Sequence, residues 1–305
     1  MNTAKRAELV EIIAVGNTLG EGVLWDPIGR RVWWTDIQER RLFRHDPLQS
    51  ALQTFDLPER LGSFGFVDAS DEIVAAFESG FAIYHPESKL LKWLSRPDHA
   101  AKNLRFNDGR VDRRGRFWAG SMVEGKGAPT AKLYCLRGVT AEVRLTDIAI
   151  SNSICFSPDG RYLYFADTPQ RVILRYDIDP TTGSIGNRKI FARTPPGAFP
   201  DGSNVDAHGY VWNAHWGAGR VVRYALDGSV DLEINVPATQ PTCVAFGGPN
   251  LDMLYVTSAR EGLSPETLAA QPRAGDVFVY KLDIQGLADS RFADPRLSRD
   301  SQIQR

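Results

Sequence analysis

Residues 154–168 read ICFSPDGRYLYFADT: an apolar strand, a Pro-Asp-Gly turn and a second strand rich in aromatic side chains. Such turns between short strands of branched and aromatic residues are typical of β-hairpins. The pattern occurs six times, as VLWDPIGRRVWWTDI, FVDASDEIVAAF, RVDRRGRFWAGSM, ICFSPDGRYLYFADT, NVDAHGYVWNAHW and VAFGGPNLDMLYVTS, beginning at Val23, Phe66, Arg110, Ile154, Asn204 and Val244. A hairpin that recurs along the whole chain predicts a repeat protein built from β-strands.

The spacing of the repeats indicates the type of repeat. Equivalent positions in the second strands lie 41, 44, 46, 48 and 43 residues apart, at Val32, Ile73, Phe117, Leu163, Val211 and Leu254. This spacing is typical of a four-stranded propeller blade. We therefore predict an all-β fold, a six-bladed β-propeller with four-stranded antiparallel blades around a central channel.

We expect residues 1–305 to form one domain, with the blades spanning roughly residues 18–285. Short tails that can pair with each other close the ring. Residues 286–305 are polar and are expected to fray as a C-terminal tail. The only segment with a helical pattern is a turn around residues 265–271.

Composition argues against several classes of partner. The 36 Lys and Arg residues balance 37 Asp and Glu residues, so no net field attracts nucleic acid or an anionic membrane. The sequence has no secretory leader and no run of about 18 apolar residues that spans a membrane. We expect a cytoplasmic protein that is a monomer or a weak homo-oligomer. Its cysteines lie in apolar segments without metal-ligand spacing and are predicted to be buried free thiols: Cys135, Cys155 and Cys243.

Equivalent residues of successive blades form a ring around the axis, and one predicted ring is polar. Its members lie eight residues before the turn glycine in four blades and at the aligned position in the other two: Glu21, Asn107, Asn152 and Asp201, with Ser63 and Thr242. Converging carboxylate and amide oxygens suit a hard divalent cation. The ring therefore predicts a metal ion at the channel mouth, although Asn and Asp are also common in turns.

Residues two positions earlier point to the same face of each strand. Five of these residues are uncharged, namely Leu19, Leu61, Ile150, Phe199 and Gln240, and the sixth is Arg105. An arginine beside a metal in an apolar collar is suited to orient a substrate. The alternative is an arginine paired with a surface carboxylate.

These segments resemble the family of senescence marker protein (regucalcin), gluconolactonase and luciferin-regenerating enzyme, especially its bacterial sugar-lactone members. The resemblance covers nearly the whole chain. It is carried by LGEGVLWD, RFNDGRVDRRGRFWAGSM, ISNSICFSPDGRYLYFAD, FPDGSNVDAHGYVWNAHWGAGRVVRY and AREGLSPETLAAQPRAGDVF, beginning at Leu19, Arg105, Ile150, Phe199 and Ala259.

The resemblance implies a metal site formed by Glu21, Asn152 and Asp201. The chain departs from the family at Ser153, where glycine usually follows the metal-binding asparagine. A serine there either tightens the site or adds a hydroxyl group to it.

The resemblance also implies substrate contacts by Arg105 and Asn107, and Asn107 is close enough to the ring to bind either the ion or the sugar. Asp108 follows and is either a further sugar contact or only part of an Asn-Asp-Gly turn. Glutamates that reach the sugar in some members align near Glu124.

Together the ring and the resemblance imply a metal-dependent hydrolase that opens a sugar lactone to the sugar acid. One divalent ion, Ca²⁺, Zn²⁺, Mg²⁺, Mn²⁺ or Fe²⁺, polarises the carbonyl, and Asp201 accepts a proton from the attacking water. The alternatives are an esterase or lactonase for a non-sugar substrate and a non-catalytic calcium-binding or protein-binding propeller. Zinc spacing among the histidines and a Gly-x-Ser-x-Gly motif are both absent from the sequence.

Four more residues are candidates for supporting roles. His215 and Trp216 end a strand in the blade of Asp201 and are expected either to pack behind the site or to touch substrate. Asp36 and Asp167 recur after aromatic strands and are expected to make structural hydrogen bonds between blades.

Overall fold

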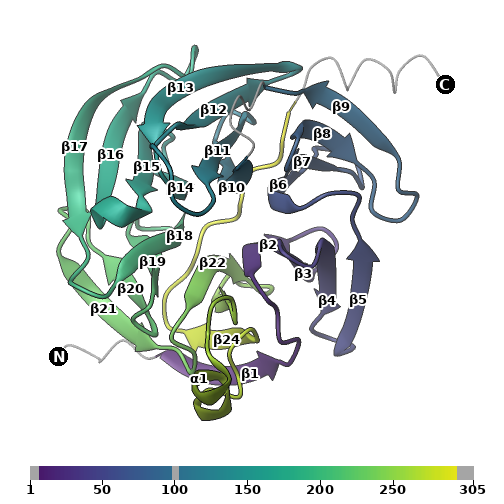
Figure 1. Ribbon diagram of the computed structural model, residues 1–305, viewed down its shortest axis with the longest axis vertical. Helices are drawn as coiled ribbons and strands as arrows, with labels where there is room; N and C mark the ends of the chain where they lie inside the picture. Colours follow the sequence, from purple (N-terminus) through teal and green to yellow (C-terminus); the bar gives the residue numbers. More distant parts are fainter. Residues whose placement is uncertain (1–6, 98–102, 294–305) are drawn as a thin grey trace.

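Six four-stranded antiparallel sheets surround a central axis in the computed structural model, which describes residues 7–97 and 103–293 (Figure 1). The predicted six-bladed β-propeller is confirmed. Each blade places its strands in order from the axis outward, and the innermost strand of each blade is the first after the loop from the preceding blade.

The first two blades contain β2 (Gly20–Asp26), β3 (Arg31–Asp36), β4 (Arg41–Asp46), β5 (Ala51–Asp56), and β6 (Leu61–Phe66), β7 (Ile73–Phe77), β8 (Gly80–Tyr84), β9 (Leu91–Ser95). The next two contain β10 (Leu104–Val111), β11 (Phe117–Val123), β12 (Ala131–Arg137), β13 (Thr140–Ile148), and β14 (Ser151–Phe156), β15 (Tyr162–Asp167), β16 (Val172–Ile178), β17 (Ile185–Arg193). The fifth contains β18 (Phe199–Val205), β19 (Val211–Trp216), β20 (Arg220–Tyr224) and β21 (Val230–Asn235).

The sixth blade is completed by the N-terminal strand of the described chain. It contains β22 (Pro241–Gly247), β23 (Met253–Ser258), β24 (Val277–Leu282) and β1 (Ala7–Ile13), and β1 pairs antiparallel with β24. The N-terminal tail thus closes the ring as predicted, but its partner β24 lies within the predicted blades and not in the C-terminal tail. The predicted helical turn is α1 (Pro265–Ala270), and a short 3₁₀ helix, η1 (Thr168–Gln170), follows β15. Within the described ranges no helix is long and apolar enough to cross a membrane.

The core lies between neighbouring blades, where the aromatic second strands pack. Trp34, Trp118 and Trp212 are fully buried there, and the three cysteines are buried and free as predicted. The innermost strands approach one another closely. A Cβ atom at Gly62 would lie 2.5 Å from the backbone carbonyl carbon of Phe106 in the next blade, so only glycine fits there.

The innermost strands are irregular at the level of the predicted polar ring. Pairing with the second strand shifts between Glu21 and Leu24 in β2 and between Asn152 and Cys155 in β14. Such bulges re-aim side chains next to functional sites. Here they follow directly after two of the ring residues.

The prediction of a frayed tail is wrong for residues 286–293, which we call the C-terminal strap. In Figure 1 the yellow chain after β24 crosses the ring. Gly286 bridges to Asp206, and Phe292, fully buried, bridges to Val67. These partners follow the ends of innermost strands, so the strap covers the end of the channel away from the polar ring. The polar composition hid this, because the strap is held by partners far away in sequence.

Candidate functional site

A pocket of about 330 Å³ lies where the innermost strands begin. Its polar lining consists of Glu21, Arg105, Asn107, Asn152, Thr168, Asp201 and Glu261. Its apolar lining consists of Leu19, Met122, Ile150, Pro169, Phe199 and Trp216. With the strap across the other end of the channel, the pocket is a one-ended cavity.

Four of the six predicted ring residues line this pocket, namely Glu21, Asn107, Asn152 and Asp201. The other two are buried but are not part of the lining. The hydroxyl of Thr242 donates to the carbonyl oxygen of Gly20, and that of Ser63 has no hydrogen-bond partner among the described residues. The structure thus brings together the ring residues that carry a carboxylate or a carboxamide.

Two buried carboxyl groups, Glu21 and Asp201, contact each other in the pocket and share a hydrogen bond. Burial raises the pKa of Glu21 to about 8, and the Asp108 carboxylate adds to this shift. Burial, followed by the charge of Glu21, raises the pKa of Asp201. Among the described residues no cationic side chain donates a hydrogen bond to either group. Both groups therefore ionise together only if a cation accompanies them, and otherwise one of them keeps a proton.

A chain of amide groups orients Asn152. Its Nδ2 donates to the hydroxyl of Thr168 over 2.8 Å, and its Oδ1 accepts from Nδ2 of Asn107 over 3.1 Å. Oδ1 of Asn107 accepts in turn from Nη1 of Arg105 over 2.7 Å. The nitrogen of Asn152 is thus held by Thr168, which leaves its oxygen as the side-chain atom available to a cation.

Asp36 and Asp167 fix the segments that enter the site. Asp36 accepts hydrogen bonds from the backbone amides of Thr18 and Leu19, at 2.7 and 3.1 Å, just before β2. Asp167 accepts from the two amides that precede β14 in the same way. Their predicted structural role is confirmed, but the bonds lie within a blade and not between blades. Each aspartate holds the strand that carries a pocket residue.

Arg105 is buried and lines the pocket together with three of the predicted collar residues, Leu19, Ile150 and Phe199. Burial lowers the pKa of its guanidinium, and the nearby carboxylate of Glu124 opposes this shift. Both interpretations of Arg105 hold in part, because the buried guanidinium lines the pocket and its Nε also donates to the partly exposed carboxylate of Glu124 over 3.2 Å.

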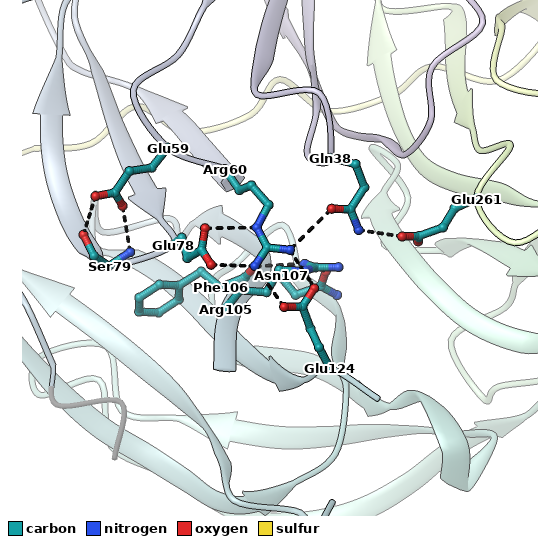
Figure 2. A network of polar contacts seen from close by, with 10 residues as sticks. All are labelled: Gln38, Glu59, Arg60, Glu78, Ser79, Arg105, Phe106, Asn107, Glu124 and Glu261. Carbon is teal, nitrogen blue, oxygen red and sulfur yellow. Dashed lines mark hydrogen bonds and ion pairs between the residues drawn. The ribbon is translucent and has the colours of Figure 1, made fainter. Parts of the chain in front are cut away.

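The structure does not bring Asp108 and Glu124 to the pocket wall. Asp108 is buried, and its Oδ2 accepts from the backbone amide of Ile154 over 2.6 Å, which ties β10 to β14. Burial raises the pKa of Asp108 to about 6. Glu124 is half-buried and accepts hydrogen bonds from Arg60 and Arg105 (Figure 2). The predicted sugar contacts by both residues therefore lack support, because each carboxylate is occupied by protein donors.

His215 and Trp216 separate into the two roles that the sequence left open. His215 is buried, with Nε2 2.9 Å from the hydroxyl of Tyr224, and burial lowers its pKa to about 3. Trp216 lines the pocket. Sequence reasoning missed Glu261 and Met122, whose positions depend on loop and bulge geometry that the hairpin register does not encode.

Ser153 joins the two blades that carry Asn152 and Asp201. Its hydroxyl donates to the backbone oxygen of Asp201 over 2.8 Å and accepts from Nδ2 of Asn213 over 3.0 Å. Its backbone has a φ of +60°, a conformation that favours glycine. The backbone of Ser153 is therefore strained. Its hydroxyl fixes the backbone of Asp201.

We expect Ser153→Gly and Ser153→Ala to weaken binding of a divalent ion equally, by about tenfold, because both remove the hydroxyl that positions Asp201. Their stabilities should differ, since glycine relieves the left-handed strain and alanine keeps it. Calorimetric ion titration and thermal unfolding of both variants measure the two effects. Wild-type affinity in both variants would show that the hydroxyl does not act on the site.

The candidate metal-binding atoms of the pocket are oxygens, unlike those of metal centres rich in histidine or cysteine. Among the residues that the structure describes, no group of three or more His, Cys, Asp and Glu side chains is placed to hold a metal. The set in the pocket has two carboxylates and a carboxamide, which is oxygen chemistry suited to hard cations.

Comparison with known proteins agrees with the fold. Residues 19–260 match the family described as the SMP-30/Gluconolactonase/LRE-like region. The chain is 38% identical over 286 residues to 6-deoxy-6-sulfogluconolactonase of Pseudomonas putida, covering 92% of this chain and 97% of that protein. It is 41% identical over 282 residues to L-arabinolactonase of Azospirillum brasilense, covering 91% and 93%.

A solved structure has the same fold. A calcium-binding protein, regucalcin, from Agrobacterium tumefaciens superposes with a TM-score of 0.89 at 31% sequence identity, covering 94% of this chain and 98% of that one.

Proposed function

Because the chain belongs to the SMP-30/gluconolactonase/LRE-like family, we propose that it hydrolyses sugar lactones with one divalent metal ion at the mouth of its channel. One observation carries the proposal. A single one-ended pocket gathers two buried carboxyl groups, an oriented carboxamide and a buried arginine: Glu21, Asp201, Asn152 and Arg105.

The residues of the pocket fit a divalent ion. Glu21 and Asp201 supply two negative charges that no cationic side chain neutralises through a hydrogen bond in the described part of the chain, and Asn152 offers an oxygen. We propose these three as the ligands. Oxygens of this kind accept Ca²⁺, Mg²⁺, Mn²⁺ and other divalent ions. When bound, the ion would polarise the lactone carbonyl and stabilise developing negative charge on its oxygen.

Asn107 is not assigned to the ion. Its Oδ1 already accepts from the cationic Arg105, and its Nδ2 donates to the carbonyl oxygen of Ser151 and to Asn152. An oxygen that accepts from a guanidinium is a poor metal ligand, because the two cations would repel. We infer that Asn107 links Arg105 to Asn152.

The protein groups have separate tasks in the proposed reaction. Asp201 accepts a proton from the attacking water, because its carboxylate lies in the pocket and its backbone is fixed by Ser153. Arg105 donates hydrogen bonds from its Nη2 to substrate oxygens and so sets the orientation of the ring. The side chains of Phe199, Met122 and Trp216 form an apolar wall that limits entry of bulk water.

A panel of aldonolactones in a proton-release assay tests the proposal, with lactones and esters that carry no sugar hydroxyls as the matched comparison. We expect sugar lactones to be opened well above their spontaneous rates. Faster turnover of the non-sugar compounds would favour an esterase for other substrates. Tight calcium binding without turnover of any compound would favour a non-catalytic calcium-binding propeller.

A further inference from the structure

A network of charged side chains lies on the rim of the pocket, across the boundary between the second and third blades (Figure 2). Arg60 directly precedes β6, Glu78 directly follows β7, and Glu124 directly follows β11. Innermost strands begin and second strands end on the same face of a propeller, which here is the face that carries the pocket.

Arg60 holds two carboxylates at once. Its Nε and Nη2 donate to Glu78 over 3.0 and 2.5 Å, and its Nη1 and Nη2 donate to Glu124 over 2.7 and 2.9 Å. The side chain of Arg60 is 17% exposed. Paired contacts of this kind fix both partners in one geometry, which a single contact does not achieve.

Glu124, which Arg60 holds in place, in turn contacts Arg105. Its Oε1 accepts from Nε of Arg105 over 3.2 Å, and its backbone amide is held by the carbonyl oxygen of Asn103 over 2.8 Å. Glu124 is the only carboxylate among the described residues that accepts a hydrogen bond from Arg105. A buried guanidinium needs such a partner, since an uncompensated buried charge is strongly unfavourable.

The contacts of Arg105 leave one of its amino groups for the substrate. Nη1 donates to Asn107 and to the carbonyl oxygen of Phe106, and Nε donates to Glu124. Nη2 donates to no residue in the part of the chain that the structure describes. Because the guanidinium is planar, fixing Nε and Nη1 also fixes Nη2.

We propose that Arg60 is a positioning residue that, through Glu124, sets the orientation of Arg105 toward the lactone. This rests on the proposed function of the pocket. Arg60 is not part of the pocket lining. It contacts the lining residue Arg105 through Glu124, and its Nη1 also donates over 3.3 Å to Gln38, whose Nε2 donates over 2.5 Å to Glu261 in the lining (Figure 2). The role of Glu124 accordingly changes from sugar contact to the link between the two arginines.

Steady-state kinetics of Arg60→Gln, with Glu59→Gln as control, tests the proposal. Glu59 neighbours Arg60, but its carboxylate accepts from the amide and hydroxyl of Ser79 and stands apart from the chain to Arg105 (Figure 2). We expect Arg60→Gln to raise KM about tenfold with kcat within about twofold, as loss of uniform substrate binding does. Glu59→Gln should change neither value, and Arg60→Lys should restore part of the loss.

Two further measurements separate positioning from other roles. Glu124→Gln should match Arg60→Gln, and the double variant should be no worse than either, because both act along one path. A crystal structure of Arg60→Gln should show Arg105 without its bond to Glu124.

Equal effects of Arg60→Gln and Glu59→Gln, additive effects in the double variant, or an unmoved Arg105 would each overturn the proposal. If no lactone is opened by the wild type, the proposed function fails, while the position of Arg105 in that crystal still decides this inference.

Discussion

Asp201→Asn is expected to lower kcat/KM for sugar lactones by about 10³-fold, because the change removes both a metal ligand and the proposed base. The fold should be preserved. Asp201 contributes to blade packing through its backbone oxygen, which accepts from Ser153 and Asn213, and asparagine keeps that atom. Initial rates in a proton-release assay measure the loss.

Asp227→Asn is the matched control for this change. Asp227 lies in a turn of the same blade, is exposed, and accepts from the backbone amide of Ser229 over 2.9 Å. We expect wild-type rates from it. Rates measured with excess ion distinguish the two tasks of Asp201, since full recovery of Asp201→Asn would limit its role to metal affinity. More than a tenth of wild-type activity in Asp201→Asn without added ion would contradict both tasks.

Asp289→Ala is expected to destabilise the protein by about 3–5 kcal/mol, because it leaves a buried guanidinium without its partner. Nη1 of Arg110 donates to Asp289 in the C-terminal strap, and the two side chains are only 5% and 8% exposed. Nη2 of Arg110 has one other contact, the carbonyl oxygen of Val244 at 3.4 Å. On thermal unfolding followed by circular dichroism, Tm should fall by on the order of 5 to 10 °C.

Asp283→Ala serves as the control, since Asp283 precedes the strap and is exposed. Its Tm should stay within about 1 °C of the wild type, as for most exposed surface positions. If Asp289→Ala melts at the same temperature as this control, the ion pair between Arg110 and the strap contributes little to stability.

The strap illustrates what the sequence does not reveal. Asp289 and Arg110 are 179 residues apart, and neither lies in a periodic pattern that would connect them. The segment is polar, so composition alone predicts a frayed tail. Its order comes from the geometry of the ring, which brings the ends of distant innermost strands beside one crossing segment.

The fold itself was predictable because every blade repeats the same hairpin. The turn before the second strand has a constant relation to the start of the innermost strand, so one register aligns Glu21, Asn107, Asn152 and Asp201. Local pairing rules therefore suffice to place these four residues near one another.

The roles of Glu124 and Ser153 were not predictable in the same way. Glu124 is held by Arg60, 64 residues away and in the neighbouring blade. Ser153 acts on the backbone of Asp201, again across a blade boundary. A repeat defines which positions are equivalent within each blade, whereas contacts between non-equivalent positions of neighbouring blades depend on rotamers and bulges.

Titration of metal-stripped protein with a divalent ion, while lactone opening is recorded, measures whether the ion in the pocket is required for turnover. We expect negligible turnover without ion, a rise that reaches its plateau at one equivalent, and binding of the ion to Glu21→Gln weakened by about tenfold or more. Metal-free protein that opens the lactone as fast as the loaded protein, or Glu21→Gln protein that binds the ion as tightly as the wild type, would contradict the proposed role of the ion.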